Sequence, residues 1–372
     1  MKFTQLLTVC LLFSLFLAMP SYAQKKGKKD SKSSSQSEKK DKDQIKSIEE
    51  VTKKCTKIAG LFTMYQDTTS GKAYLLVNAD QLGKEYIHFN YVENGILEAG
   101  YFRGAYGDAK VLKINKYYNR IEIVEQNTDY YFDKDNALSR SAQANINTPI
   151  LASEKIVGMN KAKNAFLIEA DKVFLSEALQ QIKYSPSPNS KAKNPFKIGS
   201  LSKDKTKYHS LKNYPANTDV VVEYVYENKS PTNYGYGTAT DARFTTIKIQ
   251  HSIIEMPDND YKARKDDSRV GYFLTQTDDQ LSASVTPYKD MIHRWHLVKK
   301  DPNAALSEPV EPITWWMENT TPEDLRPIIK AGVENWNIAF EAAGFKNAVV
   351  VKQQPDDADW DAGDIRYNVL RW

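Results

Sequence analysis

Cysteine is scarce in this sequence, which contains only Cys10 and Cys55 among its 372 residues. Cys10 lies within an apolar stretch that we expect to be removed, so Cys55 is the cysteine of the mature protein. A single cysteine forms no internal disulfide and cannot build a cysteine-based metal site. We therefore expect Cys55 to be a packed structural residue and not a reactive thiol.

The sequence also lacks a basic surface outside one short segment. The formal net charge is +4, and residues 24–44 alone contain eight lysines and four acidic residues. The rest of the chain is therefore close to neutral, which excludes the basic footprint typical of nucleic-acid-binding proteins. Segment 24–44 has no aliphatic or aromatic residue, so it cannot bury apolar surface and is predicted to be a disordered tether.

Long apolar runs are absent except at the N-terminus. Residues 6–19 are almost entirely apolar and precede Pro20 and the small residues Ser21 and Ala23. This pattern is typical of a secretory signal peptide, which we predict over residues 1–23 with cleavage after Ala23. A transmembrane anchor is the alternative, but the run is shorter than the roughly 20 residues that a spanning helix needs. The mature protein is expected to be secreted or periplasmic, with no transmembrane segment.

Alternating apolar residues predict a small antiparallel β domain over residues 45–135. Three hairpins are expected in it, around the turn-rich segment 67–72, around Asn94-Gly95 and around Tyr118-Asn119. Asn-Gly is the strongest of these turn signals, because both residues tolerate the positive φ angles of a two-residue hairpin turn.

A second β-rich accessory domain is predicted over residues 136–300. Its clearest strands are 219–228 and 244–257, and a short helix is expected at 176–182. The proline-rich segment 301–312 follows and is interpreted as a linker.

Residues 313–372 have a different pattern, in which a helix separates β-strands. "ITWWME", "NAVVVKQ" and "DIRYNVLRW" are interpreted as strands. Between the first two, Thr321 is the expected N-cap and Gly344 the expected C-cap of a helix. A later start of the regular helix is the alternative, because Pro327 does not fit a helix interior. The element order is β-α-β-β, so the chain as a whole is predicted to be α+β. The apolar residues of the helix recur at three-and-four spacing and form one face: Leu325, Ile328, Ile329, Val333, Trp336, Phe340 and Ala343.

The same residues resemble a known family. "EPITWWMENTTPEDLRPIIKAGVENWNIAFEAAGFKNAVVV" and "DADWDAGDIRYNVLRW" look like the start of the catalytic domain in large secreted bacterial zinc-dependent metalloproteases of the zincin, metzincin-like class. "YKARKDDSRVGYF" and "IHRWHLVKKDPNA" are similar to the uncharacterised β-rich domains that precede that catalytic domain. The resemblance extends over about residues 45–372. It implies zinc as the cofactor and a protein or peptide as the substrate of the full-length protein.

The motif that would carry this activity is missing from the sequence. A zincin needs H-E-x-x-H, in which two histidines one helical turn apart bind zinc and the glutamate activates the bound water. None of the five histidines of this sequence is followed by a glutamate and then by a second histidine at the required spacing. No catalytic residue and no metal ligand is therefore assigned. Residues 313–372 are interpreted as an incomplete zincin upper subdomain. The chain is expected to be the N-terminal fragment of a secreted zinc metalloendopeptidase and to be inactive alone.

The last predicted strand ends the chain without a turn or polar tail, which favours a continuation beyond Trp372. The helix and this strand are expected to form the structural backing of the catalytic cleft, with the two helical aromatic residues in the core. The alternative is a non-enzymatic periplasmic or surface β-rich binding module. The residues assigned to the structural backing are Trp336, Phe340, Asp364, Ile365 and Tyr367.

Three further groups of polar residues could form a site, and each also has a structural explanation. Asp266 and Asp267 lie in the acidic cluster "RKDDSR" and are hypothesised to contact the catalytic domain in a latent form. A salt-bridged loop is the alternative. His293 and His296 form the only close histidine pair, but residues three apart on a strand face opposite sides, so packing or surface roles are expected. The acidic segment "DADWDAGD" lacks the spacing of a calcium loop and is expected to be a solvated turn.

Overall fold

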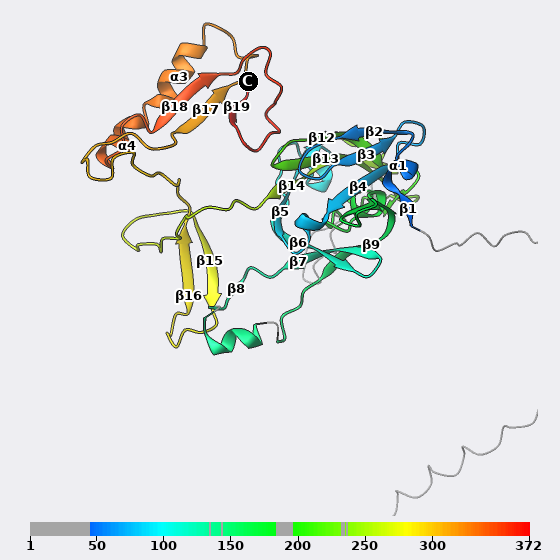
Figure 1. Ribbon diagram of the computed structural model, residues 1–372. Helices are drawn as coiled ribbons and strands as arrows, with labels where there is room; N and C mark the ends of the chain where they lie inside the picture. Colours follow the sequence, from blue (N-terminus) through cyan, green and yellow to red (C-terminus); the bar gives the residue numbers. More distant parts are fainter. Residues whose placement is uncertain (1–44, 134, 143, 184–195, 232–234, 236) are drawn as a thin grey trace, which may run out of the picture. The chain divides into compact units, whose positions relative to one another are not determined.

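A computed structural model of the protein describes residues 45–133, 135–142, 144–183, 196–231, 235 and 237–372 (Figure 1). The predicted signal peptide, residues 1–23, and the predicted tether, residues 24–44, lie outside the described residues. Among the residues that are described, no helix is both long and apolar enough to cross a membrane.

Within the described residues, thirteen strands form one nearly barrel-like sheet, with every pairing antiparallel except that of β1 with β9. The order along the sheet is β11-β13-β14-β5-β6-β7-β9-β10-β4-β3-β2, and β12 pairs with β13. Near the two ends of this order, the Asn213 amide of β12 donates a hydrogen bond to the Ile58 carbonyl of β2, at 3.0 Å. The strands are β1 (Lys46–Ser47), β2 (Cys55–Ile58), β3 (Met64–Asp67), β4 (Ala73–Asn78), β5 (Glu85–Asn94), β6 (Lys110–Tyr117), β7 (Arg120–Gln126), β9 (Ile150–Met159), β10 (Ala165–Glu169), β11 (Ser200–Leu201), β12 (Lys207–Asn213), β13 (Asn217–Glu227) and β14 (Phe244–Glu255).

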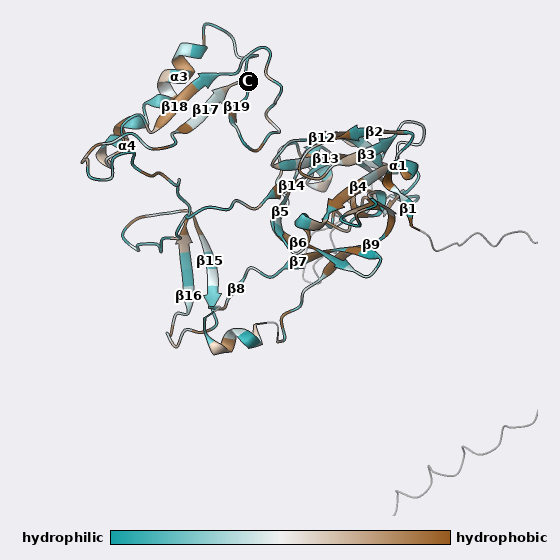
Figure 2. Ribbon diagram, in the orientation of Figure 1, coloured by the Kyte–Doolittle hydropathy of each residue, from teal (hydrophilic) through white to brown (hydrophobic). Residues whose placement is uncertain are grey.

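The sheet encloses the main hydrophobic core, and Figure 2 shows the apolar character of strands such as β4. Along β5, Tyr86, His88 and Asn90 are buried, whereas Phe89 and Tyr91 face the other side and are partly exposed. This period of two is the reason that an alternating sequence makes a strand with one face in the core. Burying a large apolar side chain stabilises the fold by roughly 2–3 kcal/mol, and the most deeply buried include Phe62, Phe174, Tyr224 and Tyr226.

Two of the three predicted hairpins are confirmed. Strands β6 and β7 pair around Tyr118, whose φ of 49° allows the tight turn. Strands β3 and β4 pair around the segment 67–71, where the Asp67 carboxylate accepts hydrogen bonds from the backbone. The hairpin at Asn94-Gly95 is wrong, because β5 pairs instead with β6 and with β14. Gly95 is needed there for a close approach, since a Cβ would lie 2.6 Å from the Tyr101 carbonyl.

The helix predicted at residues 176–182 is also wrong. The chain forms only the single-turn helix α2 (Asp171–Phe174), and residues after Leu175 are irregular. A second short helix, α1 (Ile48–Val51), lies near the start of the described residues.

The predicted boundary near residue 135 does not separate two sheets. Strands from before and after it are hydrogen bonded in the same thirteen-stranded sheet, for example β7 with β9. A separate three-stranded sheet combines β8 (Tyr130–Tyr131) with β15 (Leu274–Asp279) and β16 (Tyr288–Ile292). Strand pairing therefore joins residues from both sides of the expected boundary in both sheets.

Residues 313–370 form a β-α-β-β unit with three parallel strands in the order β18-β17-β19. Its elements are β17 (Ile313–Met317), α3 (Arg326–Glu334), α4 (Asn337–Ala342), β18 (Val349–Gln353) and β19 (Asn368–Leu370). The predicted helix is thus two helices, and the first begins after Leu325 and not at Thr321, because Pro327 fits only its first turn. The last strand is shorter than predicted, since residues 364–367 form a turn.

The end of the helical segment was predicted correctly, but its packing was not. Gly344 has a φ of 91°, and the Phe345 amide donates to the Phe340 carbonyl at 2.8 Å, as in a Schellman cap. Neither α3 nor α4 has a buried residue, and Trp336 is 66% exposed. The prediction that Trp336 lies in the core is therefore wrong, and Phe340 is only half-buried.

Candidate functional site

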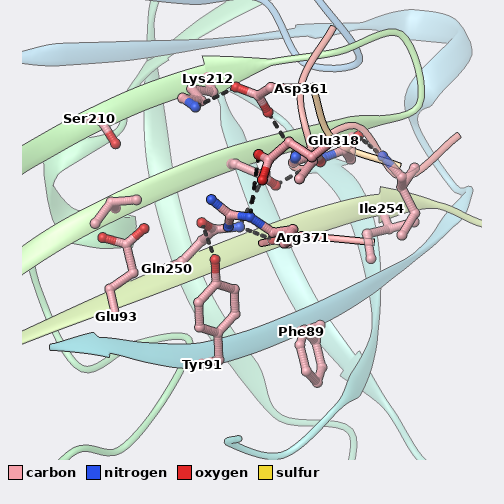
Figure 3. A pocket seen from close by; sticks show the side chains of 17 residues that line it. Phe89, Tyr91, Glu93, Ser210, Lys212, Gln250, Ile254, Glu318, Asp361 and Arg371 are labelled. Carbon is pink, nitrogen blue, oxygen red and sulfur yellow. Dashed lines mark hydrogen bonds and ion pairs between the residues drawn. The ribbon is translucent and has the colours of Figure 1, made fainter. Parts of the chain in front are cut away.

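A polar cavity of about 490 Å³ lies against the outer face of the large sheet. Strands β5, β12, β13 and β14 form its floor, and residues of the β-α-β-β unit form its other wall (Figure 3). The cavity uses the strand residues that face away from the core, such as Phe89 and Tyr91 of β5. The alternation that fills the core on one face therefore leaves a row of polar and aromatic side chains on the other.

Asp219 is the most buried carboxylate of the cavity, with 3% of its surface exposed. It accepts hydrogen bonds from the Asn217 amide at 2.9 Å and from the Gln250 amide at 3.1 Å. The Tyr91 hydroxyl donates to the other end of the Gln250 amide at 2.8 Å and so fixes its orientation (Figure 3). Burial raises the pKa of Asp219 to about 6, and the nearby negative charge of Asp361 acts in the same direction.

Asp361 holds the other wall of the cavity to the sheet. Its carboxylate accepts a charged hydrogen bond from Lys212 of β12 and a second from the Tyr214 hydroxyl, both at 2.5 Å. Burial alone would raise the pKa of this carboxyl, but these donors outweigh burial and the pKa is lowered. Asp361 is therefore an ion-pair partner. The close donors of Asp219 are instead neutral, the Asn217 and Gln250 amides and the Ser252 hydroxyl, and the charge of Lys212 only partly opposes the effect of burial on the pKa of Asp219.

The segment 361–365 is bound through its backbone as well. Asn217, only 2% exposed, donates to the Gly363 carbonyl at 2.9 Å and accepts from the Ile365 amide at 3.1 Å. A Cβ on Gly363 would lie 2.9 Å from the Tyr214 hydroxyl, so a larger residue would require this hydroxyl to shift. The acidic segment that was expected to be a solvated turn is thus a contact between the β-α-β-β unit and the large sheet.

The cavity has a second charged pair and an unpaired acid. Arg371 lies 3.8 Å from Glu318 and is largely exposed, so this ion pair is weak. Glu93, at the end of β5, also lines the cavity. Neither Glu93 nor Asp219 has a lysine or arginine within 4.0 Å in the part of the chain that the structure describes.

The five residues assigned to the backing of a catalytic cleft are not gathered in one place. Ile365 lines the polar cavity, and the neighbouring Asp364 is buried and paired with Arg366 at 2.7 Å. Tyr367 stacks on Trp360, with ring centroids 3.8 Å apart. Trp336 and Phe340 line a different, apolar groove of about 450 Å³, formed by the β-α-β-β unit together with Trp295.

The acidic cluster upstream is a salt-bridged loop. Arg269 contacts the Asp267 carboxylate through two nitrogens, at 2.6 and 2.9 Å, and these bonds lower the pKa of Asp267 to about 2. Asp266 is exposed, and its amide donates to the Asp290 carbonyl at 3.0 Å. The loop therefore has the salt bridge expected in the structural alternative. The contact of Asp266 and Asp267 with a catalytic domain stays a prediction.

The close histidine pair does not converge on one site. His293 lies 2.8 Å from the Thr275 hydroxyl, whereas His296 pairs with Asp260 at 3.1 Å. Among the described residues, no three side chains of the types His, Cys, Asp and Glu lie close enough together to hold a metal ion.

Sequence reasoning missed a buried chain of hydrogen bonds inside the large sheet. The Tyr224 hydroxyl donates to the Phe174 carbonyl at 2.6 Å, so it must accept from His251 Nε2, at 2.8 Å. His251 Nδ1 is then the acceptor for His88 Nε2, at 3.1 Å. His88 Nδ1 is left buried and without a hydrogen-bond partner among the described residues.

Burial keeps both histidines neutral. It lowers the pKa of His88 to about 4, with a smaller contribution from Lys110, and it lowers the pKa of His251 well below its usual value. The sequence does contain one signal for the burial of these two histidines: each occupies an inward-facing position of an alternating strand.

Fold and site together define an antiparallel β-rich protein with a polar cavity on the outside of its sheet. Residues 104–300 match a family described as a domain of unknown function, DUF5117. Because the match includes more than half of the chain, the protein belongs to this family. The matched region includes Lys212, Asp219 and Gln250 of the cavity. A search of curated proteins and a search of solved structures each returned no significant match.

Proposed function

We propose that this chain supplies the β-rich accessory region and the first strands and helices of a secreted zinc metallopeptidase. The observation that carries the proposal is the β-α-β-β unit of residues 313–370, which has the element order expected from the resemblance. In this interpretation the large sheet is an accessory domain that holds the unit through the segment 361–365. Localisation outside the cytoplasm and a protein or peptide substrate belong to the same proposal.

The exposed apolar surface of the unit supports this function. A parallel sheet is ordinarily covered on both faces, yet Trp336 and Ile338 of α4 are 66% and 70% exposed. The groove beside them is lined almost entirely by apolar side chains, including Trp315 and Phe340. Such a surface fits an element on which further polypeptide packs.

Zinc belongs to the proposed full-length enzyme and not to the residues of this chain. The sequence has no H-E-x-x-H motif, and the described residues offer no cluster of three ligands. Zinc requires three or four such ligands, so the residues present do not fit it. The chain's own contribution is structural, and no catalytic step is assigned to it.

The test is to read the coding sequence downstream of the Trp372 codon and to assay the longest product of that frame. We expect an H-E-x-x-H motif within about a hundred residues, and we expect the longer protein to bind zinc and hydrolyse casein in a chelator-sensitive manner. The 372-residue chain should show no hydrolysis under the same conditions. A stop codon directly after Trp372 in independent isolates, or a longer product without zinc or hydrolysis, would refute the proposal and leave a binding module as the function.

A further inference from the structure

We infer that the polar cavity binds an organic ammonium group, the free amino terminus or a lysine side chain of a peptide, with Asp219 as the anchoring carboxylate. The residues that line the cavity lie between Phe89 and Arg371, so the inference does not depend on the proposed peptidase.

The charges that line the cavity are unbalanced. Lys212 and Asp361 neutralise each other across 2.5 Å, and Arg371 is the nearest base to Glu318. Among the described residues, Glu93 and Asp219 have no salt bridge, so the cavity carries an excess of negative charge that a ligand cation would balance. The acidic residues of the lining are Glu93, Asp219, Glu318 and Asp361, against the basic residues Lys212 and Arg371.

A positively charged ligand would stabilise the buried carboxylate of Asp219. A buried carboxylate is costly unless its oxygens are hydrogen bonded or paired with a cation. Asn217 and Gln250 each supply one amide donor to Asp219 and Ser252 supplies a hydroxyl, whereas an ionised carboxylate has four lone-pair sites. An ammonium group brings three donors and a full positive charge, so it supplies what these neutral amides lack.

The remaining walls favour an organic cation over a metal ion. Phe89, Tyr91 and Ile254 contribute carbon surface to the cavity, which suits the methylene or backbone atoms that carry an ammonium group. Aromatic faces also attract organic cations. A divalent metal would need further oxygen or nitrogen ligands close to Asp219, and the described residues contain no such group of three.

The binding test is a calorimetric titration of the purified 372-residue chain with three probes that carry no charged group other than an ammonium. Triglycine amide carries a free amino terminus, N-acetyl-lysine amide carries only the side-chain ammonium, and N-acetyl-triglycine amide carries neither. We expect one or both amines to bind and the third probe not to bind, and the two amines identify the source of the ammonium. Absence of binding by both amines, or equal binding by all three probes, would overturn the assignment.

Two variants and one pH series locate the binding group. Asp219→Asn should weaken amine binding at least tenfold, whereas Asp80→Asn, at an exposed residue that does not line the cavity, should leave it unchanged. Because a carboxyl with a pKa near 6 is about one-tenth ionised at pH 5, the unmodified chain should bind about tenfold more weakly at pH 5 than at pH 7.5. If Asp219→Asn does not fold, the partly exposed Glu93→Gln should weaken binding severalfold. Unchanged affinity in the folded Asp219 variant, or across the pH series, would exclude Asp219 as the anchor.

The readout separates this binding site from the proposed peptidase. Amine binding is measured on a chain without an H-E-x-x-H motif and without added zinc. Failure of the downstream sequence test would therefore leave the binding result standing, and failure of amine binding would leave the metallopeptidase proposal untouched.

Discussion

Acid should destabilise the large sheet through the buried imidazole of His88. In the unfolded chain this imidazole has its ordinary pKa of 6.5, so it takes up a proton as the pH falls below that value. In the folded chain burial holds the pKa at about 4, and protonation would place a charge in a core where His88 is fully buried. Between pH 6.5 and pH 4 the unfolded state thus binds more protons, and stability falls as the pH is lowered.

The magnitude follows from the shift. About 2.5 pKa units at 1.36 kcal/mol each correspond to a loss of about 3 kcal/mol from this one group between pH 7 and pH 4. His88→Phe removes the titrating group and should abolish that part of the pH dependence. At constant pH it also removes the hydrogen bond to His251, which shifts stability by an amount that does not vary with pH in this range.

Urea unfolding at several pH values measures the effect. All six tryptophans lie at or after Trp295, so far-UV circular dichroism and not tryptophan fluorescence should follow the large sheet. The unfolding free energy of His88→Phe relative to the parent should rise by about 3 kcal/mol from pH 7 to pH 4. His88→Gln provides the same comparison if the phenylalanine does not pack. Parallel curves for parent and variants over this range would refute the reasoning.

Three other predictions concern the cavity and the acidic loop. Asp219→Asn should show the opposite pH trend and lose about 2 kcal/mol relative to the parent from pH 7 to pH 4. The folded Asp219 carboxyl takes up its proton near pH 6 whereas the unfolded one does so near 3.8, so protonation stabilises the parent and not the variant; the same urea series tests this. Asn217→Ala deletes one buried and two partly buried hydrogen bonds and should release the segment 363–365 at a cost of about 3 kcal/mol. Amide exchange there should accelerate about a hundredfold, and unchanged exchange would contradict the contact. Asp266→Ala combined with Asp267→Ala, made in the longer gene product, should raise basal proteolysis if the loop maintains latency, and unchanged activity would exclude that role.

Local structure was largely predictable from the sequence, because it depends on short-range rules. Alternation identified β13 and β14, and the turn at Tyr118 followed from the residues flanking it. Long-range pairing was not predictable, since β5 pairs with β14 about 160 residues later in the chain and no local pattern encodes that partner. The failure at Asn94-Gly95 has the same origin, because the tertiary approach of Tyr101 and not a hairpin explains the glycine.

The cavity was invisible in the sequence for a related reason. Its residues come from strands distant in the chain and from the segment 361–365, and each taken alone has an ordinary explanation. Asp219 precedes the run "VVVEYVY" and reads as the polar start of a buried strand. Only the close packing of β13 against β14 and of Gly363 against Tyr214 reveals that this carboxylate is enclosed.

Asn217 contacts both the carboxylate of Asp219 and the backbone of the segment 361–365. Its amide nitrogen donates both to Asp219 and to the Gly363 carbonyl, and its amide oxygen accepts from the Ile365 backbone. One buried side chain therefore orients the anionic group of the cavity and attaches the β-α-β-β unit to the large sheet. A cation that settles on Asp219 changes the charge next to the donor that also holds the Gly363 carbonyl. If the inferred cation binds Asp219, its binding and the attachment of the unit would influence each other through this shared amide.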